Sequence, residues 1–349
     1  MTHPIPTGYP DVMPYANHSR TFADNKYVYP VLSRRSKGIS VGINLNPDRV
    51  CNFDCIYCQV DRTGYIPPRE VDIKLIGSEL RETLDLVHSG RLFSIPPFDK
   101  TPPELRHLSD IAFSGDGEPT TFLDFYDVVK EVIRVRQDVR AFSGEPPMGH
   151  GLTKRHENPV CHPDPSCHPD PSCHPELVSG SQTLEIPKQV RNDRTGFSDE
   201  TRLILLTNTS GLSRPWVQDA IDLLYKHNGE VWIKLDAGSD EYFKSVSRTH
   251  IAFRDILHNI IVTAKRHPVT IQSCFNKTDN IIPPHDEIIA YCNRLKEIRE
   301  NGGMIRLVQI YTIARPPADD RVTPLSKAEL TGIADKVKEI SCLQAEVFL

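Results

Sequence analysis

Short runs rich in β-branched residues alternate with helical patterns along most of this sequence. Between the runs, apolar residues recur three or four positions apart, as at Phe253, Ile256 and Ile260, which predicts amphipathic helices. Strands that alternate with helices form a parallel sheet covered by those helices. Six such units predict an α/β fold, an open partial (β/α)6 barrel whose reactive face lies at the carboxyl ends of the strands. The six runs are residues 39–45, 110–115, 202–208, 230–236, 268–275 and 304–312.

One stretch, residues 138–200, loses this periodicity. The hexamer CHPDPS occurs twice there and then begins a third time, and repeated prolines exclude a continuous helix or strand. Its low-complexity composition predicts a disordered insertion between the second helix and the third strand. The predicted organisation is therefore an N-terminal extension (1–38), a first part of the barrel (39–137), the insertion, and the remainder of the barrel with a C-terminal segment (201–349).

Three cysteines follow the first predicted strand in the segment CNFDCIYCQVDR, spaced C-x3-C-x2-C. Cys51, Cys55 and Cys58 are close enough in sequence to face one small centre. A structural zinc site usually has four ligands in two separated pairs, but the next cysteine, Cys161, lies inside the insertion. Thiolates are the usual ligands of iron–sulfur clusters, and three of them on a four-iron cube leave one iron open. The triplet therefore favours a [4Fe-4S] cluster over zinc or three unrelated buried cysteines.

A second segment, FSGDGEPT (113–120), ends the second predicted strand. Gly115 and Gly117 let the backbone approach a ligand closely, and the carboxylates of Asp116 and Glu118 suit an ammonium group. Alone, the same pattern is equally typical of a tight turn. Its position one strand after the cysteines predicts that both segments face the same site.

The cysteine spacing, with the aromatic Tyr57 just before Cys58, resembles the signature of the radical S-adenosylmethionine (SAM) superfamily. The resemblance implies a partial barrel of the radical SAM type and a [4Fe-4S] cluster whose open iron is chelated by SAM. It also implies that the segment from Gly115 to Glu118 receives the SAM ammonium group. In that superfamily an electron from the cluster, supplied by a donor such as flavodoxin or ferredoxin, splits SAM. The resulting 5′-deoxyadenosyl radical abstracts hydrogen from a substrate.

A longer likeness narrows the resemblance. Residues 30–62, together with FSGDGEPT and KLDA (234–237), are similar to the branch of the superfamily that includes the tRNA wyosine-base synthases. They look more like bacterial proteins of that branch with no assigned reaction. The likeness implies a tRNA base as one candidate substrate, although the shared motifs encode SAM cleavage and not the substrate. Asn208 and Lys234, at the ends of later strands, are candidates for contacts with a ribose or carboxylate; no catalytic residue is predicted.

The charge balance does not indicate a general nucleic-acid binder. The chain has a net charge of −5, and the insertion holds six of its basic and ten of its acidic residues, which leaves −1 elsewhere. A basic patch of Arg34, Arg35, Lys37 and Arg62 at the barrel mouth would still hold one RNA loop, because RNA loops are read largely by stacking and edge contacts. The alternatives are a small molecule or peptide in the barrel lumen, or a metal-binding protein without radical chemistry.

The sequence predicts a cytoplasmic protein with no membrane partner. No run of about 18 apolar residues is present, and the N-terminus has no basic segment followed by an apolar core. Nine cysteines without a secretion signal predict the reducing cytoplasm. The Cys-His pairs that begin at Cys161, Cys167 and Cys173 could bind a second metal, but six-residue tandem repetition explains their spacing without selection for ligands.

Overall fold

The predicted alternation of strands and helices is confirmed. The computed structural model describes residue 20 and residues 22–62, 70–142 and 201–349. All six predicted strands are present, with ends within two residues of those predicted. They are β2 (Gly38–Ile43), β3 (Leu108–Phe113), β4 (Arg202–Thr207), β5 (Gly229–Lys234), β6 (Val269–Cys274) and β8 (Ile305–Tyr311).

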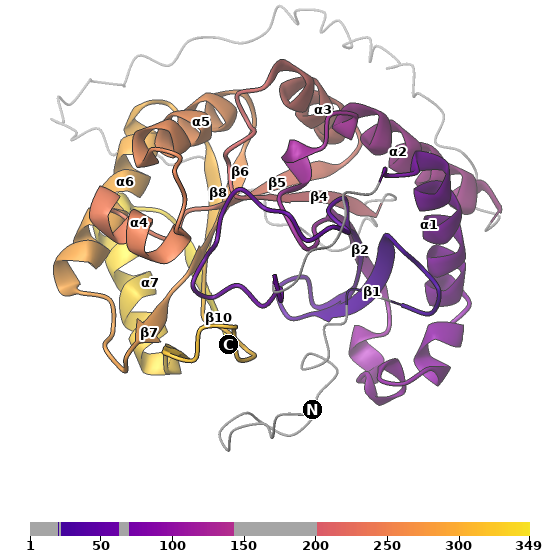
Figure 1. The fold of residues 1–349 in the computed structure, drawn as a ribbon, viewed down its shortest axis with the longest axis horizontal. Helices are drawn as coiled ribbons and strands as arrows, with labels where there is room; N and C mark the ends of the chain where they lie inside the picture. Colours follow the sequence, from indigo (N-terminus) through magenta and orange to yellow (C-terminus); the bar gives the residue numbers. More distant parts are fainter. Residues whose placement is uncertain (1–19, 21, 63–69, 143–200) are drawn as a thin grey trace, which may run out of the picture.

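Two further strands extend the sheet at its edges. β1 (Val28–Ser33), inside the predicted N-terminal extension, pairs antiparallel with β2, and β10 (Ala345–Phe348) pairs parallel with β8. The eight strands form one curled sheet with the order β1-β2-β3-β4-β5-β6-β8-β10 (Figure 1). A separate two-stranded sheet joins β7 (Asn276–Thr278) to β9 (Val322–Pro324). The predicted open (β/α)6 half-barrel is therefore confirmed, with additional strands outside the six repeated units.

Helices connect the parallel strands and lie along the outer side of the curled sheet (Figure 1). In the helix Phe253–Arg266, Phe253, Ile256 and Ile260 are buried, whereas Arg254 and His258 are exposed, as the helical spacing predicts. The helices are α1 (Ile73–His88), α2 (Phe125–Phe142), α3 (Pro215–Lys226), α4 (Asp240–Ser247), α5 (Phe253–Arg266), α6 (His285–Glu300) and α7 (Lys327–Ser341). Short 3₁₀ turns lie at Arg91–Ser94, Phe98–Lys100, Pro103–Leu105 and Pro119–Thr121.

Residues along each strand alternate between the helix-covered core and the concave side of the sheet. In β5, Val231 and Ile233 pack in the main core, whereas Trp232 and Lys234 line a cavity on the concave side. Ile204 of β4 packs beside Trp232 and lines the same cavity. The period of two along a strand therefore separates the residues that hold the fold together from those available to a ligand.

The first residues of the predicted insertion, 138–142, lie in a helix. α2 continues to Phe142, past the predicted start of the insertion at residue 138, and β4 begins at Arg202. Residues 143–200, which include the three Cys-His pairs, lie outside the described residues. The predicted disorder of that stretch and the predicted domain boundaries therefore stay predictions.

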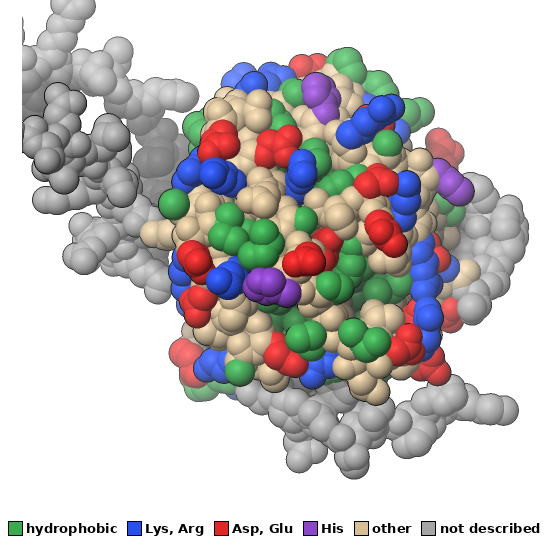
Figure 2. Space-filling model, turned by 90° about the vertical axis from the view of Figure 1, so that its left-hand side faces the viewer, with side chains coloured by type: hydrophobic (Ala, Val, Ile, Leu, Met, Phe, Trp, Pro, Cys, Tyr) green, Lys and Arg blue, Asp and Glu red, His purple; other side chains and the backbone are tan. Residues whose placement is uncertain are grey.

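Charged side chains of both signs cover one side of the outer surface (Figure 2). Figure 2 shows the side that lies at the left of Figure 1, where α4, α5 and α6 lie, and there acidic and basic side chains are interspersed. That side therefore shows no continuous basic face among its described residues. Within the described part of the chain, no helix is both long and apolar enough to cross a membrane.

Candidate functional site

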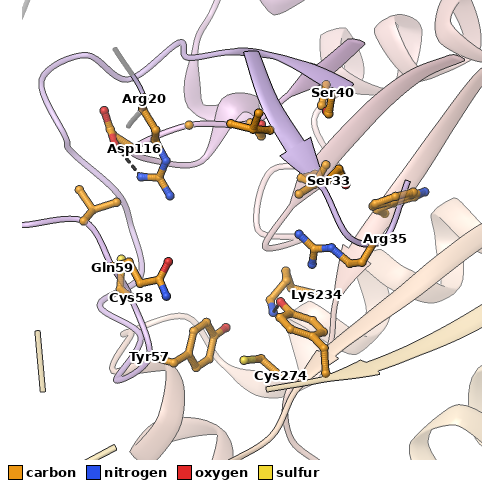
Figure 3. Close-up of a pocket in the computed structure, with 18 of the residues that line it drawn as sticks. Arg20, Ser33, Arg35, Ser40, Tyr57, Cys58, Gln59, Asp116, Lys234 and Cys274 are labelled. Carbon is orange, nitrogen blue, oxygen red and sulfur yellow. Dashed lines mark hydrogen bonds and ion pairs between the residues drawn. The ribbon is translucent and has the colours of Figure 1, made fainter. Parts of the chain in front are cut away.

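A cavity of about 350 Å³ lies on the concave side of the half-barrel. Its volume falls in the range of small-molecule sites, roughly 300–1,000 Å³. The cysteine segment, the segment that ends β3, and residues at the ends of β4, β5, β6 and β8 line it together. Figure 3 shows Cys58 and Gln59 on one wall of this cavity and Arg35 and Lys234 on the other. The two segments singled out in the sequence therefore face one space.

The cysteine segment is held in place by main-chain contacts. The backbone N–H groups of Asp54 and Ile56 donate to the carbonyls of Ser247 and Val246 at the end of α4, at 3.1 and 2.9 Å. The N–H of Cys58 donates to the Cys55 carbonyl at 2.8 Å, which closes a tight turn between the last two cysteines. This loop has no regular secondary structure, so its shape depends on these contacts.

All three predicted cluster ligands are free thiols that line the cavity. Cys51, Cys55 and Cys58 are each half-buried. Burial, with the Asp236 carboxylate nearby, raises the pKa of Cys55 to about 12. A thiol must lose its proton to bind iron, so cluster binding would release protons here. The Arg62 guanidinium lies 3.5 Å from Cys58 Sγ and would stabilise a thiolate.

The donor set fits an iron–sulfur cluster. Within the described ranges, no group of three or more His, Cys, Asp or Glu side chains is close enough together to hold one metal ion. Each thiolate of a four-iron cube binds a different iron, so the three sulfurs need not converge on one point. Three thiols that line one cavity, with no fourth protein ligand required, match a cube with one open iron.

The glycine segment after β3 is pressed against the chain that follows β2. A Cβ atom at Gly115 would meet Asn44, and one at Gly117 would meet the Val50 carbonyl and Asn46. Asp116 accepts hydrogen bonds from Asn44 Nδ2 at 2.7 Å and from Arg20 Nη1 at 2.6 Å; Figure 3 marks the second. The segment therefore requires glycine for close packing, and this holds whether or not it also contacts a ligand.

Glu118 is buried, and its carboxylate accepts four hydrogen bonds. Oε1 accepts from the Thr120 N–H at 3.1 Å and from the hydroxyls of Thr120 and Thr207 at 2.6 and 2.8 Å. Oε2 accepts from the Asn208 N–H at 2.6 Å. Burial raises the pKa of Glu118, although these hydrogen bonds oppose the rise. The carboxylate thus joins the ends of β3 and β4, and its contact with the SAM ammonium group stays a prediction.

The two other predicted ligand residues lie on different parts of the cavity. The Asn208 side chain reaches the cysteine segment, where its Nδ2 donates to Asn52 Oδ1 at 2.8 Å. Lys234 Nζ lies 3.0 Å from Asp236 Oδ1 and donates to the Tyr311 hydroxyl at 2.5 Å. Although burial disfavours its charge, Asp236 and Tyr311 hold the pKa of Lys234 above its ordinary value. Lys234 is therefore an ammonium group with one carboxylate partner.

Some lining residues were missed or only partly anticipated. Arg20 lies in the N-terminal extension, where no pattern marked it, and it lines the cavity through its ion pair with Asp116. Arg315 also lines the cavity; it follows β8, and its place after the carboxyl end of a predicted strand could have identified it from sequence. Of the predicted basic patch, Arg34, Arg35 and Arg62 line the cavity, and Lys37 is not among the lining residues.

Comparisons with known proteins find likenesses in sequence and in structure. The chain matches no protein-family model. It is 27% identical over 123 residues to the GTPase Obg of Brachyspira hyodysenteriae, a stretch that covers 34% of this chain and 15% of that protein. The chain thus spans about 15% of the length of the curated relative that it matches. A radical SAM methyltransferase from Sphaerobacter thermophilus superposes with a TM-score of 0.49 at 10% identity, over 92% of this chain and 68% of that one.

Proposed function

We propose that this protein is a radical SAM enzyme. The observation that carries the proposal is that the C-x3-C-x2-C thiols and the Gly115–Glu118 segment line one cavity inside a (β/α)6 half-barrel. A [4Fe-4S] cluster with SAM would supply, on reduction, a 5′-deoxyadenosyl radical that abstracts hydrogen from a substrate. A one-electron donor protein such as flavodoxin or ferredoxin, in the cytoplasm, would serve as the reductant.

The residues of this chain have distinct roles in the proposal. Cys51, Cys55 and Cys58 hold the cluster, while Arg62 balances the charge beside Cys58. Gly115 and Gly117 allow the backbone to approach SAM, whose ammonium group suits the carboxylates that flank them. Tyr57 and Asn208 fix the cysteine loop against the ends of β5 and β4. Ala112, Ile204 and Trp232 pack together and give the cavity an apolar wall.

Two classes of substrate deserve a test. The resemblance to wyosine-base synthases favours a tRNA base, held by the basic residues Arg34, Arg35 and Arg62 that line the cavity. A small anionic molecule is the second candidate, because those cations lie inside a cavity rather than on an open face. Mass spectrometry of nucleosides from total tRNA, with and without the gene, separates the two. A modified base that disappears supports tRNA, and an unchanged profile supports the small molecule.

Metal content tests the cluster directly. Purified without oxygen and supplied with iron and sulfide, the protein should be brown and carry about four irons per chain. Cys55→Ala should lose the cluster, because two thiolates hold a cube poorly. Cys342→Ser is the matched control, since Cys342 is a free, exposed cysteine outside the cavity. A colourless protein with a single zinc ion would contradict the proposal.

A further inference from the structure

The cavity holds more positive than negative charge. Among the described residues, six basic and three acidic side chains line it. Asp116 pairs with Arg20 and Glu118 accepts four hydrogen bonds, whereas Asp110 accepts from Ser40 Oγ at 2.5 Å but has no hydrogen-bond partner at Oδ2 among the described residues. The lining charged residues are Arg20, Arg34, Arg35, Arg62, Lys234, Arg315, Asp110, Asp116 and Glu118.

Three of the basic residues, Arg35, Arg62 and Arg315, form no ion pair within the described ranges, although the Asp110 carboxylate interacts with the charge of Arg35 at longer range. Arg20 and Lys234 lie 2.6 and 3.0 Å from carboxylate oxygens, and Arg62 contacts Cys58. No carboxylate of the described chain is within salt-bridge distance of Arg35 or Arg315. A guanidinium removed from water without a counter-charge is costly, so such a group favours binding of an anion.

Arg315 shows this cost most clearly. Its Nε is buried and has no hydrogen-bond partner among the described residues. Burial lowers the pKa of Arg315 to about 10, which leaves it charged at neutral pH. Its loop lies beside the cysteine segment, because Gln59 Nε2 donates to the Arg315 carbonyl at 3.0 Å. The Arg315 guanidinium, which lines the cavity, thus carries a positive charge that no carboxylate of the described chain pairs with.

Arg35 approaches from the turn between β1 and β2. Its guanidinium carbon lies 4.8 Å from the centre of the Tyr311 ring, and Lys234 Nζ lies 4.7 Å from the same centre. Two cations therefore share one aromatic ring; the Asp236 carboxylate pairs with Lys234, and the charge of Asp110 acts on Arg35. Figure 3 shows Arg35 and Lys234 across the cavity from Cys58 and Gln59.

From this arrangement we infer that Arg35, with Lys234 beside it and Arg315 lining the same cavity, forms a subsite for an anionic oxygen group of the substrate, a carboxylate or a phosphate. Guanidinium groups bind both through paired N–H donors. The inference rests on the proposed function only in assigning the anion to the substrate. If SAM binds near the cysteines, an anion bound beside Arg35, on the opposite side of the cavity, belongs to the substrate and not to SAM.

Equilibrium dialysis of the full-length protein with labelled inorganic phosphate, and separately with acetate, tests the subsite. The protein should be measured both before and after reconstitution with iron and sulfide, in the presence of SAM. Arg35→Gln and Arg315→Gln should each weaken binding of the preferred anion by roughly tenfold, the loss of one charge-assisted contact. Lys37→Gln is the matched control, because it neutralises a charge in the same turn outside the cavity. The anion that binds more tightly identifies the group as phosphate or carboxylate.

The subsite is wrong if neither anion binds the wild type, or if either arginine variant binds as tightly as the wild type. Circular dichroism of each variant must match the wild type before its binding is interpreted. Formation of 5′-deoxyadenosine from SAM is measured in parallel without substrate. Arginine-dependent anion binding without SAM cleavage would keep the subsite and refute the proposed function. SAM cleavage without arginine-dependent anion binding would support the proposed function and refute the subsite.

Discussion

The phenol of Tyr57 donates a hydrogen bond to Asp236 Oδ2 at 2.5 Å. Tyr57 lies between the last two cysteines, and Asp236 follows β5, 179 residues away in sequence. Asp236 also accepts from the Cys274 N–H at 2.7 Å and pairs with Lys234 at 3.0 Å. One carboxylate thus joins the cysteine loop to the ends of β5 and β6. The aromatic residue of the cysteine motif therefore has a structural role here.

Tyr57→Phe should lower the free energy of unfolding by about 1–2 kcal/mol. The substitution removes a hydrogen bond to a carboxylate, typically worth about 1.5–3 kcal/mol when well shielded, and Tyr57 is half-buried. Urea unfolding measures the change. Tyr126→Phe is the control, because Tyr126 is exposed at the surface of α2. An equal loss in both variants would show that the Tyr57 hydroxyl does not hold the loop.

Gly115→Ala should destabilise the fold by about 1–3 kcal/mol, since the new methyl group would collide with Asn44. Asn44 in turn holds Asp116 through two hydrogen bonds, at 2.7 and 3.1 Å. Gly332→Ala in α7 is the matched control: nothing lies within 4 Å of its new methyl group. That variant should gain up to about 1 kcal/mol from helix propensity. The midpoints of thermal unfolding of the Gly115→Ala and Gly332→Ala variants are compared, and equal midpoints would exclude the collision at Gly115.

Glu118→Gln should change the pH dependence of stability. Burial raises the pKa of Glu118 above its ordinary 4.5, so near that pH the folded chain binds more protons than the unfolded chain. The resulting stabilisation is complete below the unfolded pKa and is lost as pH rises through the raised folded pKa. The stability of the wild type relative to Glu118→Gln should therefore fall from about pH 4.5 upward. Urea unfolding across this range measures it, and a constant or rising difference would contradict the shift.

The regular parts of the fold are predictable because they rest on local pattern. β-branched runs gave all six central strands, and spacing gave the helices between them. β1 escaped prediction because its segment VYPVLS contains Pro30, which is tolerated at a sheet edge but weakens a strand signal. The four-residue β10 is too short to show a period.

The residues of the candidate site also fall into two groups, those that local sequence predicts and those that only the fold brings together. The cysteines and the glycine segment are each continuous in sequence, so their spacing could be recognised before folding. Arg20, Arg35 and Arg315 come from opposite ends of the chain and line one cavity only because the sheet curls. Likewise, Glu118 has the sequence context of a ligand, but the structure shows its carboxylate in four internal hydrogen bonds. Such long-range pairings have no local signature.

Deletion of residues 145–198, with a short Gly-Ser linker, should preserve both folding and iron content. The two flanks are joined without the insertion, because Arg136 Nη1 of α2 donates to the carbonyls of Thr201 and His227 at 2.7 and 2.9 Å. The deletion also lies at the amino end of β4, whereas the cysteines follow the carboxyl end of β2. Circular dichroism and iron analysis of the shortened protein check this. Loss of the cluster on deletion would give the insertion a structural role.

Reductive cleavage of SAM tests the central claim most directly. The reconstituted protein is mixed with SAM and dithionite without oxygen, and 5′-deoxyadenosine is measured by chromatography. The wild type and Cys342→Ser should form it, and Cys55→Ala should form none, since Cys55 lines the cavity and Cys342 does not. Absence of 5′-deoxyadenosine from a wild-type protein that carries its cluster, or equal amounts from all three proteins, would contradict the assignment.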